Sequence, residues 1–283
     1  MARIQLFSAV IGIAIAGFAP TVASAGAASG WAGYIDLGAS GIFGGEWGNY
    51  FDTFGWDGSV LHATGKVATD LAPSFTVQGD ASANYWSERA SYGDTWSALF
   101  DDFAAHASWH PSANSLIGGF ASYGGGDGAS YGTFGVEAQH WMGATRVYGQ
   151  LGFLSQLGSD ETASVPYVEG VLTHYFDPNV AVSVFAGYDH ATGDNGTAWA
   201  QDDFNLGARL ELKPSAAPMT VYVSYLGFGS HGAYAGNDVY NQSQQQVSFG
   251  IRVPLGGGGG TLKALDQAVG LSDMNPWYGE MPH

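Results

Sequence analysis

Apolar and polar residues alternate along most of the chain with a period of two. Between Ser74 and Tyr85 the odd positions carry apolar, aromatic or glycine residues, and the even positions carry Ser, Thr, Gln, Asp or Asn. This pattern is typical of a β-strand with one apolar and one polar face. The alternation recurs with its phase reset after each turn and predicts eleven strands between 55 and 255. Only for 115–123 is it ambiguous which residues face inward, because the apolar Leu116 and Ile117 would point in opposite directions.

The connections between these strands differ in length and composition. Short links rich in Pro, Asp or Asn alternate with longer stretches rich in Gly, Ser, Asp and Asn. The short links are 70–73, 111–114, 143–144, 177–179 and 214–218, and the long ones are 87–98, 124–130, 155–163, 189–201 and 229–244. Short periplasmic turns and longer external loops are the pattern of outer-membrane barrels.

The number of strands must be even for such a barrel to close. Residues 31–43 supply the missing strand, because Ile35, Leu37 and Ala39 alternate with polar neighbours, and a long aromatic loop follows at 44–54. We therefore predict an all-β fold, a transmembrane antiparallel up-and-down β-barrel of about 12 strands, over residues 26–255.

The composition agrees with a barrel in lipid and excludes several other classes. Charged residues make up 12% of the chain, against about 25% in soluble proteins. The absence of cysteine excludes disulfides and thiolate metal sites. A net charge of -17 argues against a nucleic-acid partner. No motif indicates a metal site or a cofactor.

The end of the last predicted strand carries a recognisable pattern. Ser248, Gly250, Val253 and Leu255 form a polar residue, a glycine and two spaced apolar residues. On this pattern and on the architecture over 31–255, the chain resembles bacterial outer-membrane β-barrel proteins of porin-like type. The resemblance implies a location in the cell outer membrane, contact with its lipids and insertion by the barrel-assembly machinery. Pro254 departs from the pattern, and the chain continues past Leu255. No particular porin family and no oligomeric state is indicated.

Both ends of the chain differ from the barrel. Arg3, the apolar run from Leu6 to Phe18 and Ala23-Ser24-Ala25 predict a signal peptide over 1–25. A membrane anchor is disfavoured, since a spanning helix needs roughly 20 apolar residues. At the other end, 256–283 is predicted to be a Gly-rich linker and a short periplasmic tail. Its helical apolar face could bind a partner or fold back into the barrel, but we expect a mobile extension.

The phase of each strand predicts which charges face the interior. Lys or Arg facing lipid at mid-membrane costs about 2–4 kcal/mol, so charges should share the inward phase. The candidate pore-lining residues are Asp36, Lys66, Asp80, Asp102, Glu137, Arg146, Glu169, Arg209, Glu211 and Arg252. These side chains could line a water-filled pore or pair across the lumen and plug it, and we favour the open pore.

Aromatic residues near the strand ends suggest girdles at the two membrane interfaces. We expect one girdle toward the loops, at Tyr85, Trp86, Tyr123, Tyr131 and Tyr188, and another toward the turns, at Trp109, Trp141, Tyr175 and Phe176. Core residues of a soluble sandwich are the alternative.

Together these patterns favour a passive channel for small hydrophilic solutes. The long loops are acidic, which indicates either a preference of the channel for cations or only a well-solvated exterior. The first alternative is a closed structural or adhesive surface barrel that acts through these loops. A hydrolase built on Asp102, His106, Ser108 and His110 is disfavoured, because residues two apart on a strand lie about 6.6 Å apart. We therefore expect no enzymatic activity.

Overall fold

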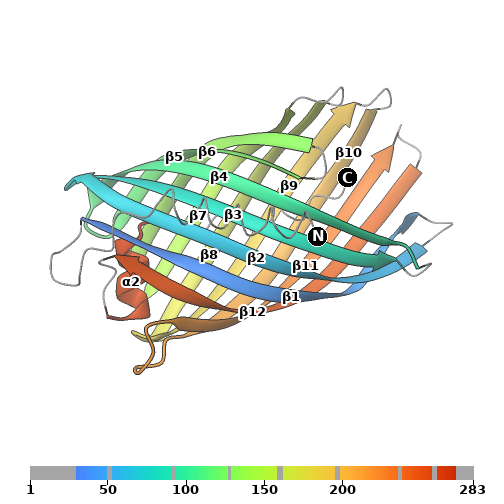
Figure 1. Cartoon of the computed structure of the whole chain (residues 1–283). Coiled ribbons are helices and arrows are strands. Elements are labelled where there is room, and N and C mark those ends of the chain that lie inside the picture. Colours follow the sequence, from blue (N-terminus) through green and yellow to red (C-terminus); the bar gives the residue numbers. More distant parts are fainter. Residues whose placement is uncertain are drawn as a thin grey trace.

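Twelve antiparallel strands form a closed barrel in the computed structural model of the chain (Figure 1). The model describes residues 30–49, 53–90, 93–126, 129–157, 162–194, 198–234, 238–256 and 260–271. The strands are β1 (Trp31–Asn49), β2 (Thr53–Ala72), β3 (Phe75–Ala90), β4 (Thr95–Ser112), β5 (Ser115–Gly126), β6 (Ala129–Met142), β7 (Thr145–Leu157), β8 (Thr162–Asp177), β9 (Val180–Asp194), β10 (Ala198–Leu212), β11 (Thr220–Tyr234) and β12 (Asp238–Gly256). The predicted signal peptide at 1–25 lies outside the described residues.

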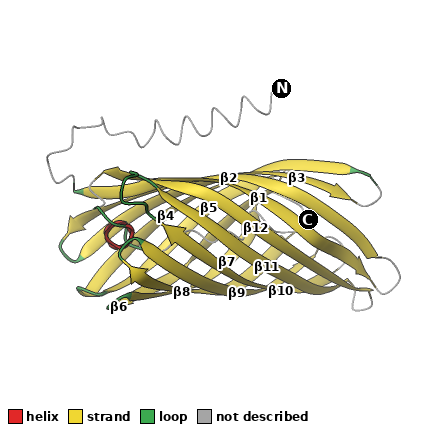
Figure 2. Cartoon of the chain, turned by 90° about the horizontal axis from the view of Figure 1, so that it is seen from below, coloured by secondary structure: helices red, strands yellow, loops and turns green. Residues whose placement is uncertain are grey.

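Each strand pairs with its neighbours in sequence, and β1 closes the barrel by pairing with β12 (Figure 2). Closure gives both edge strands a partner, so no ladder of unpaired N–H and C=O groups is left along the wall. The predicted fold class and strand number are confirmed. The open phase of 115–123 is also resolved, because Leu116 and Phe120 are buried while Ile117 and Tyr123 face outward.

The strands are longer than the sequence pattern predicted. The stretch 229–244, expected to be a loop, is mostly strand, since β11 runs to Tyr234 and β12 begins at Asp238. The other predicted long loops are shortened in the same way. A bilayer needs strands of only about 9–11 residues, whereas β2 has 20. The polar composition therefore marks strand ends that continue pairing beyond the membrane, rather than irregular loops.

We call the barrel end that holds the links 73–74, 113–114, 143–144, 178–179 and 213–219 the turn end, and the opposite end the loop end. The first residue of β1 and the last residue of β12 lie at the turn end, because Ala32 pairs with Gly256.

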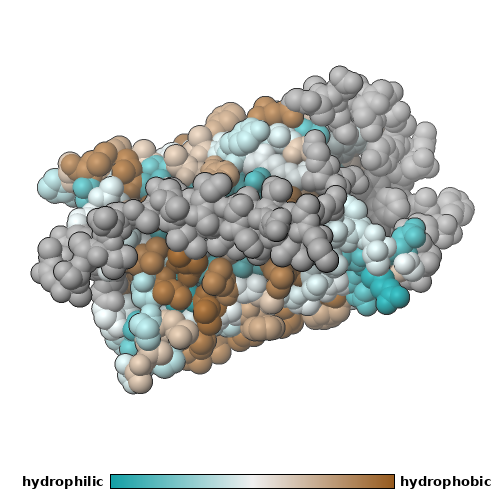
Figure 3. Space-filling view, viewed as in Figure 1, coloured by the Kyte–Doolittle hydropathy of each residue, from teal (hydrophilic) through white to brown (hydrophobic). Residues whose placement is uncertain are grey.

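The outer wall is apolar. Large hydrophobic side chains on every strand are strongly exposed, among them Val136 at 59%, Phe204 at 58% and Phe249 at 65%. On the face drawn in Figure 3, brown apolar atoms gather over the wall. A soluble protein would bury these side chains, whereas a closed barrel turns them to acyl chains. The barrel is therefore an outer-membrane one. Among the described residues, no helix is long and apolar enough to cross a membrane.

Pro254 does not interrupt the last strand. It pairs with Tyr34 of β1, while pairing of β12 with β11 ends at Arg252. Proline lacks an N–H, so it fits where a strand has a neighbour on one side only.

The described part of the tail folds back into the turn end (Figure 1). A short helix, α2 (Leu262–Ala268), begins at Thr261, whose side chain accepts a hydrogen bond from the Ala264 N–H. The helix ends before Gly270, whose φ of 86° is the left-handed conformation that glycine favours. Leu262, Leu265, Val269 and Leu271 are almost fully buried. Residues 260–271 are therefore packed inside the barrel instead of forming the expected mobile extension.

Candidate functional site: a charged lumen closed at the turn end

All ten candidate pore-lining residues point into the barrel. Nine of them are buried, and the Arg209 side chain is 19% exposed. A cavity of about 210 Å³ occupies the lumen, and seven of the ten line it, namely Asp36, Lys66, Arg146, Glu169, Arg209, Glu211 and Arg252. Asp80, Asp102 and Glu137 face inward but do not line this cavity.

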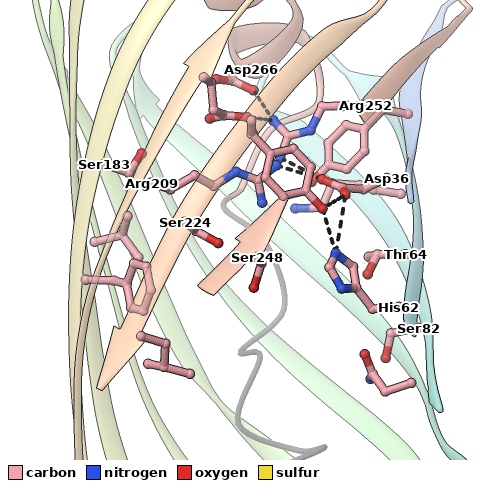
Figure 4. A pocket seen from close by; sticks show the side chains of 18 of the residues that line it. Asp36, His62, Thr64, Ser82, Ser183, Arg209, Ser224, Ser248, Arg252 and Asp266 are labelled. Carbon is pink, nitrogen blue, oxygen red and sulfur yellow. Dashed lines mark hydrogen bonds and ion pairs between the residues drawn. The ribbon is translucent and has the colours of Figure 1, made fainter. Parts of the chain in front are cut away.

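Asp36 on β1 is the centre of the first charge network (Figure 4). Its carboxylate accepts hydrogen bonds from Arg209 at 2.7 Å and from the Tyr222 hydroxyl at 2.6 Å. Arg252 lies 3.5 Å from the same carboxylate and 3.1 Å from Glu211. Taking charges out of water is costly unless each is paired, so this network satisfies groups from β1, β10, β11 and β12 together.

Two aromatic rings support the arginines of this network. The Arg209 guanidinium lies 3.6 Å from the centre of the Tyr222 ring, and that of Arg252 lies 4.2 Å from the centre of the Tyr34 ring. Stacking of this kind holds a guanidinium in one orientation, which fixes the charge that faces the cavity.

A second network joins β2, β3, β4 and β6. Lys66 lies 3.7 Å from Asp80, and His106 lies 3.4 Å from Asp80 and 2.8 Å from Glu137. The Tyr148 hydroxyl donates to Glu137 at 3.0 Å. Both ring nitrogens of His106 therefore face carboxylates.

In this arrangement His106 is not placed to activate Ser108, as the hydrolase alternative would require. A nucleophilic serine would need its hydroxyl against a histidine nitrogen. His106 instead pairs with Asp80 and Glu137, and the Asp102 carboxylate accepts from Ser122 at 3.3 Å. Within the described residues, no group of three or more His, Asp or Glu side chains is placed to hold a metal ion.

The tail enters the first network through Asp266 on α2. Arg252 lies 3.4 Å from its carboxylate, and the Tyr175 hydroxyl donates to the other carboxylate oxygen. Asp266 is itself 4% exposed. The tail thus adds a third buried carboxylate beside Arg252, which Asp36 and Glu211 already contact.

The backbone that follows α2 is bound by side chains of the second network and its neighbours. Lys66 donates to the Leu271 carbonyl at 2.9 Å, and Gln139 donates to the Gly270 carbonyl at 2.8 Å. The Leu271 N–H donates to Gln78 at 3.1 Å. These contacts come from β2, β3 and β6.

The other end of the segment is bound to the β8–β9 turn. The Lys263 N–H donates to the Pro178 carbonyl at 3.0 Å, and the Leu262 N–H donates to the Asn179 side chain at 3.2 Å. Since β3 and β9 lie on opposite sides of a twelve-stranded barrel, residues 260–271 cross the turn end from wall to wall.

Apolar contacts complete this closure. Leu265 and Val269 share a buried cluster with Ala32 and Tyr34, and Leu271 packs with Leu116 and Tyr148. Leu262 packs in a third cluster that contains Trp141, Tyr175 and Ala181. The helical apolar face predicted from the sequence is therefore covered by inward-facing side chains of the barrel.

Several residues expected in the aromatic girdles belong to the interior instead. Trp141 and Tyr175 are buried and stack with ring centres 5.6 Å apart, and Trp86 and Tyr131 belong to interior apolar clusters near the loop end. Their phase in the alternation would have identified them, because they share the parity of the inward charges on their strands. Trp109, Tyr123, Phe176 and Tyr188 face outward as expected, and Tyr85 is half-buried.

Acidic and basic side chains are equal in number at the cavity surface. Four acids line it (Asp36, Glu169, Glu211 and Asp266), and so do four bases (Lys66, Arg146, Arg209 and Arg252). Ser and Thr hydroxyls from several strands also line it (Figure 4), together with apolar side chains such as Val60, Val171 and Phe185. Such a chamber can hydrate and orient a small polar solute of either charge.

Comparison with solved structures finds the same fold in outer-membrane proteins. An outer membrane channel from Pseudomonas putida F1 has a TM-score of 0.58 at 11% identity, over 84% of this chain and 99% of the channel. The translocator domain of the autotransporter NalP from Neisseria meningitidis has a TM-score of 0.51 at 12% identity, over 89% of this chain and 97% of the domain. No protein-family model and no curated protein sequence matches the chain. At such identities the likeness concerns the fold alone.

Proposed function

We propose that this protein is a narrow outer-membrane channel for passive diffusion of small hydrophilic solutes. The observation that carries the proposal is the cavity of about 210 Å³, lined in part by acidic and basic side chains, inside a closed barrel with an apolar exterior. A buried chamber rich in charges and hydroxyls is costly unless water or solute occupies it. The same fold in an outer-membrane channel is consistent with this proposal.

A lean toward cations is a further part of the proposal, and the cavity does not account for it. Acids and bases are equal in number at the cavity surface, so selectivity would come from exposed acids near the loop end, such as Glu46, Asp57 and Asp94. An acidic entrance concentrates cations, and salt screens the effect over about 10 Å at 0.1 M ionic strength.

A closed structural or adhesive barrel is the second candidate, and residues 260–271 favour it. They lie across the turn end and contact nearly opposite walls, so the docked segment obstructs the lumen there. The two candidates differ in one respect, which is whether this closure is permanent.

Single-channel recording of the purified, refolded protein in planar bilayers tests the proposal. We expect discrete current steps and, in a salt gradient, a reversal potential shifted toward that of the cation. Silence in folded preparations of normal gel mobility would reject the channel and favour the closed barrel.

Selectivity is tested by removing one acidic side chain of the cavity. Glu169 lines the cavity and accepts a hydrogen bond from Gln150 at 3.0 Å. Glu169→Gln keeps a polar side chain of similar size, so we expect an intact barrel and a reversal potential shifted toward anions. Asp57→Asn removes the same charge from the exposed loop end, which the proposal makes the source of the cation preference, so we expect it to shift the reversal potential toward anions as well. If only Glu169→Gln shifts the potential, the cavity determines selectivity rather than the entrance.

A further inference from the structure

We infer that residues 260–271 are a releasable plug. Asp266 holds this plug in the turn end, and the lumen opens when the plug leaves. This inference rests on the proposed channel function and names its regulation. The contacts that hold the segment to the barrel differ from those that hold the barrel together, and this difference carries the argument.

The charged side chains of the wall that bind the segment, Arg252 and Lys66, have other partners in the barrel. When Asp266 leaves, Arg252 still has Glu211 at 3.1 Å and Asp36 at 3.5 Å. When the Leu271 backbone leaves, Lys66 still has Asp80 at 3.7 Å, and Gln78 still donates to Asp80 at 3.1 Å. Arg252 and Lys66 therefore keep a charged partner after release. Breaking a buried ion pair is costly when it leaves a charge without a partner.

The polar contacts of the segment itself differ from those of the wall. The Asp266 carboxylate is buried against Arg252 and Tyr175, which contact it in the plugged state. Outside the barrel this carboxylate would be hydrated. A change that weakens the Asp266 contacts thus shifts the balance toward release, while the barrel keeps its own network.

The segment is too short to be a stable unit by itself. Helix α2 has 7 residues, and isolated helices of fewer than about 12 residues are marginal in water. Its order depends on docking of Leu262, Leu265, Val269 and Leu271 against the wall. The segment is therefore either docked and ordered or released from the wall. The glycine run 256–260 joins it to β12.

Chemical labelling measures release directly. The chain has no cysteine, so Val269→Cys places a single thiol at a position that is 2% exposed when the segment is docked. The reagent is a polyethylene glycol maleimide, too large to enter the barrel, and labelling is read as a gel shift. We compare Val269→Cys alone, with Asp266→Asn, and with Gln267→Ala, which changes an exposed neighbour on the same helix.

Asp266→Asn should raise the labelling rate about tenfold, since it weakens charge-assisted hydrogen bonds, whereas Gln267→Ala should leave it unchanged. Heat-modifiable gel mobility verifies that each barrel is folded. An unchanged rate in folded Asp266→Asn would overturn the assignment of Asp266 as the latch.

Current recording of the same variants separates the plug from the channel. We expect Asp266→Asn to increase the open time in proportion to its labelling. Faster labelling with the same current as Gln267→Ala would show that the segment does not gate the lumen, and would overturn the inference while the channel stands. No current from any variant, with faster labelling in Asp266→Asn, would instead reject the proposed channel and its gating together.

Discussion

At the residue scale, Gly38 shows how a missing side chain shapes the lumen. It is an inward position on β1, and a Cβ atom there would lie 2.4 Å from both His62 Nε2 and the Tyr222 hydroxyl. These two groups are hydrogen-bonded to each other at 2.6 Å, and Tyr222 also donates to Asp36. The glycine therefore leaves the space in which the Asp36 network forms.

Gly38→Ala should displace Tyr222 and His62 and lower the free energy of unfolding by about 1–3 kcal/mol, as overpacking of a filled interior does. The measurement is urea unfolding in phospholipid vesicles, followed by tryptophan fluorescence. Gly65→Ala is the control, because a Cβ atom at Gly65 meets nothing within 4 Å. Equal stability of the two variants would mean that the Tyr222 position is not constrained by Gly38.

The sequence predicted which charges face inward but not which of them meet. Period-two phase was sufficient for Asp36 and Arg209, because a charge facing lipid is unfavourable. Their hydrogen bond joins residues 173 positions apart in the chain. Such a contact depends on the register of every intervening strand and on closure of β1 with β12, and no local pattern records these.

At the element scale, the tail was the least predictable part. Its amphipathic face at Leu262, Leu265 and Val269 was visible in the sequence, but what covers that face was not. The clue lay in inward-facing apolar residues such as Leu116 and Trp141, which are unexpected in a wet lumen. They are explained once residues 260–271 pack against them.

Leu265→Ala should weaken docking of the segment by about 2–5 kcal/mol, since it removes a side chain that is 1% exposed. We expect amide hydrogens of 260–271 to exchange faster while those of β1 and β12 keep their protection. Gln267→Ala, at an exposed position of the same helix, should not change exchange. Unaltered protection in Leu265→Ala would mean that apolar packing does not hold the segment.

At the scale of the whole molecule, counting turns predicted twelve strands, but hydropathy could not give their lengths. Alternation of apolar residues stops at the membrane surface, whereas hydrogen bonding between neighbouring strands continues into water. Strands such as β1 and β12 therefore extend together through residues of polar or mixed composition. The apolar band that faces lipid is formed by all strands of the closed wall together. Substitutions at two depths on one strand can test where this band lies.

Val136 and Met142 both face outward on β6, with exposures of 59% and 53%, but Val136 is central and Met142 is the last residue at the turn end. Val136→Arg should lower the free energy of unfolding in phospholipid vesicles by about 2–4 kcal/mol, because it places a charge among acyl chains. Met142→Arg should cost at most about 1 kcal/mol, since a charge near the interface reaches water. Urea titration of the two variants measures the difference. If both variants cost equally little, the exterior of β6 does not face a hydrocarbon layer, and the membrane-spanning orientation of the barrel is wrong.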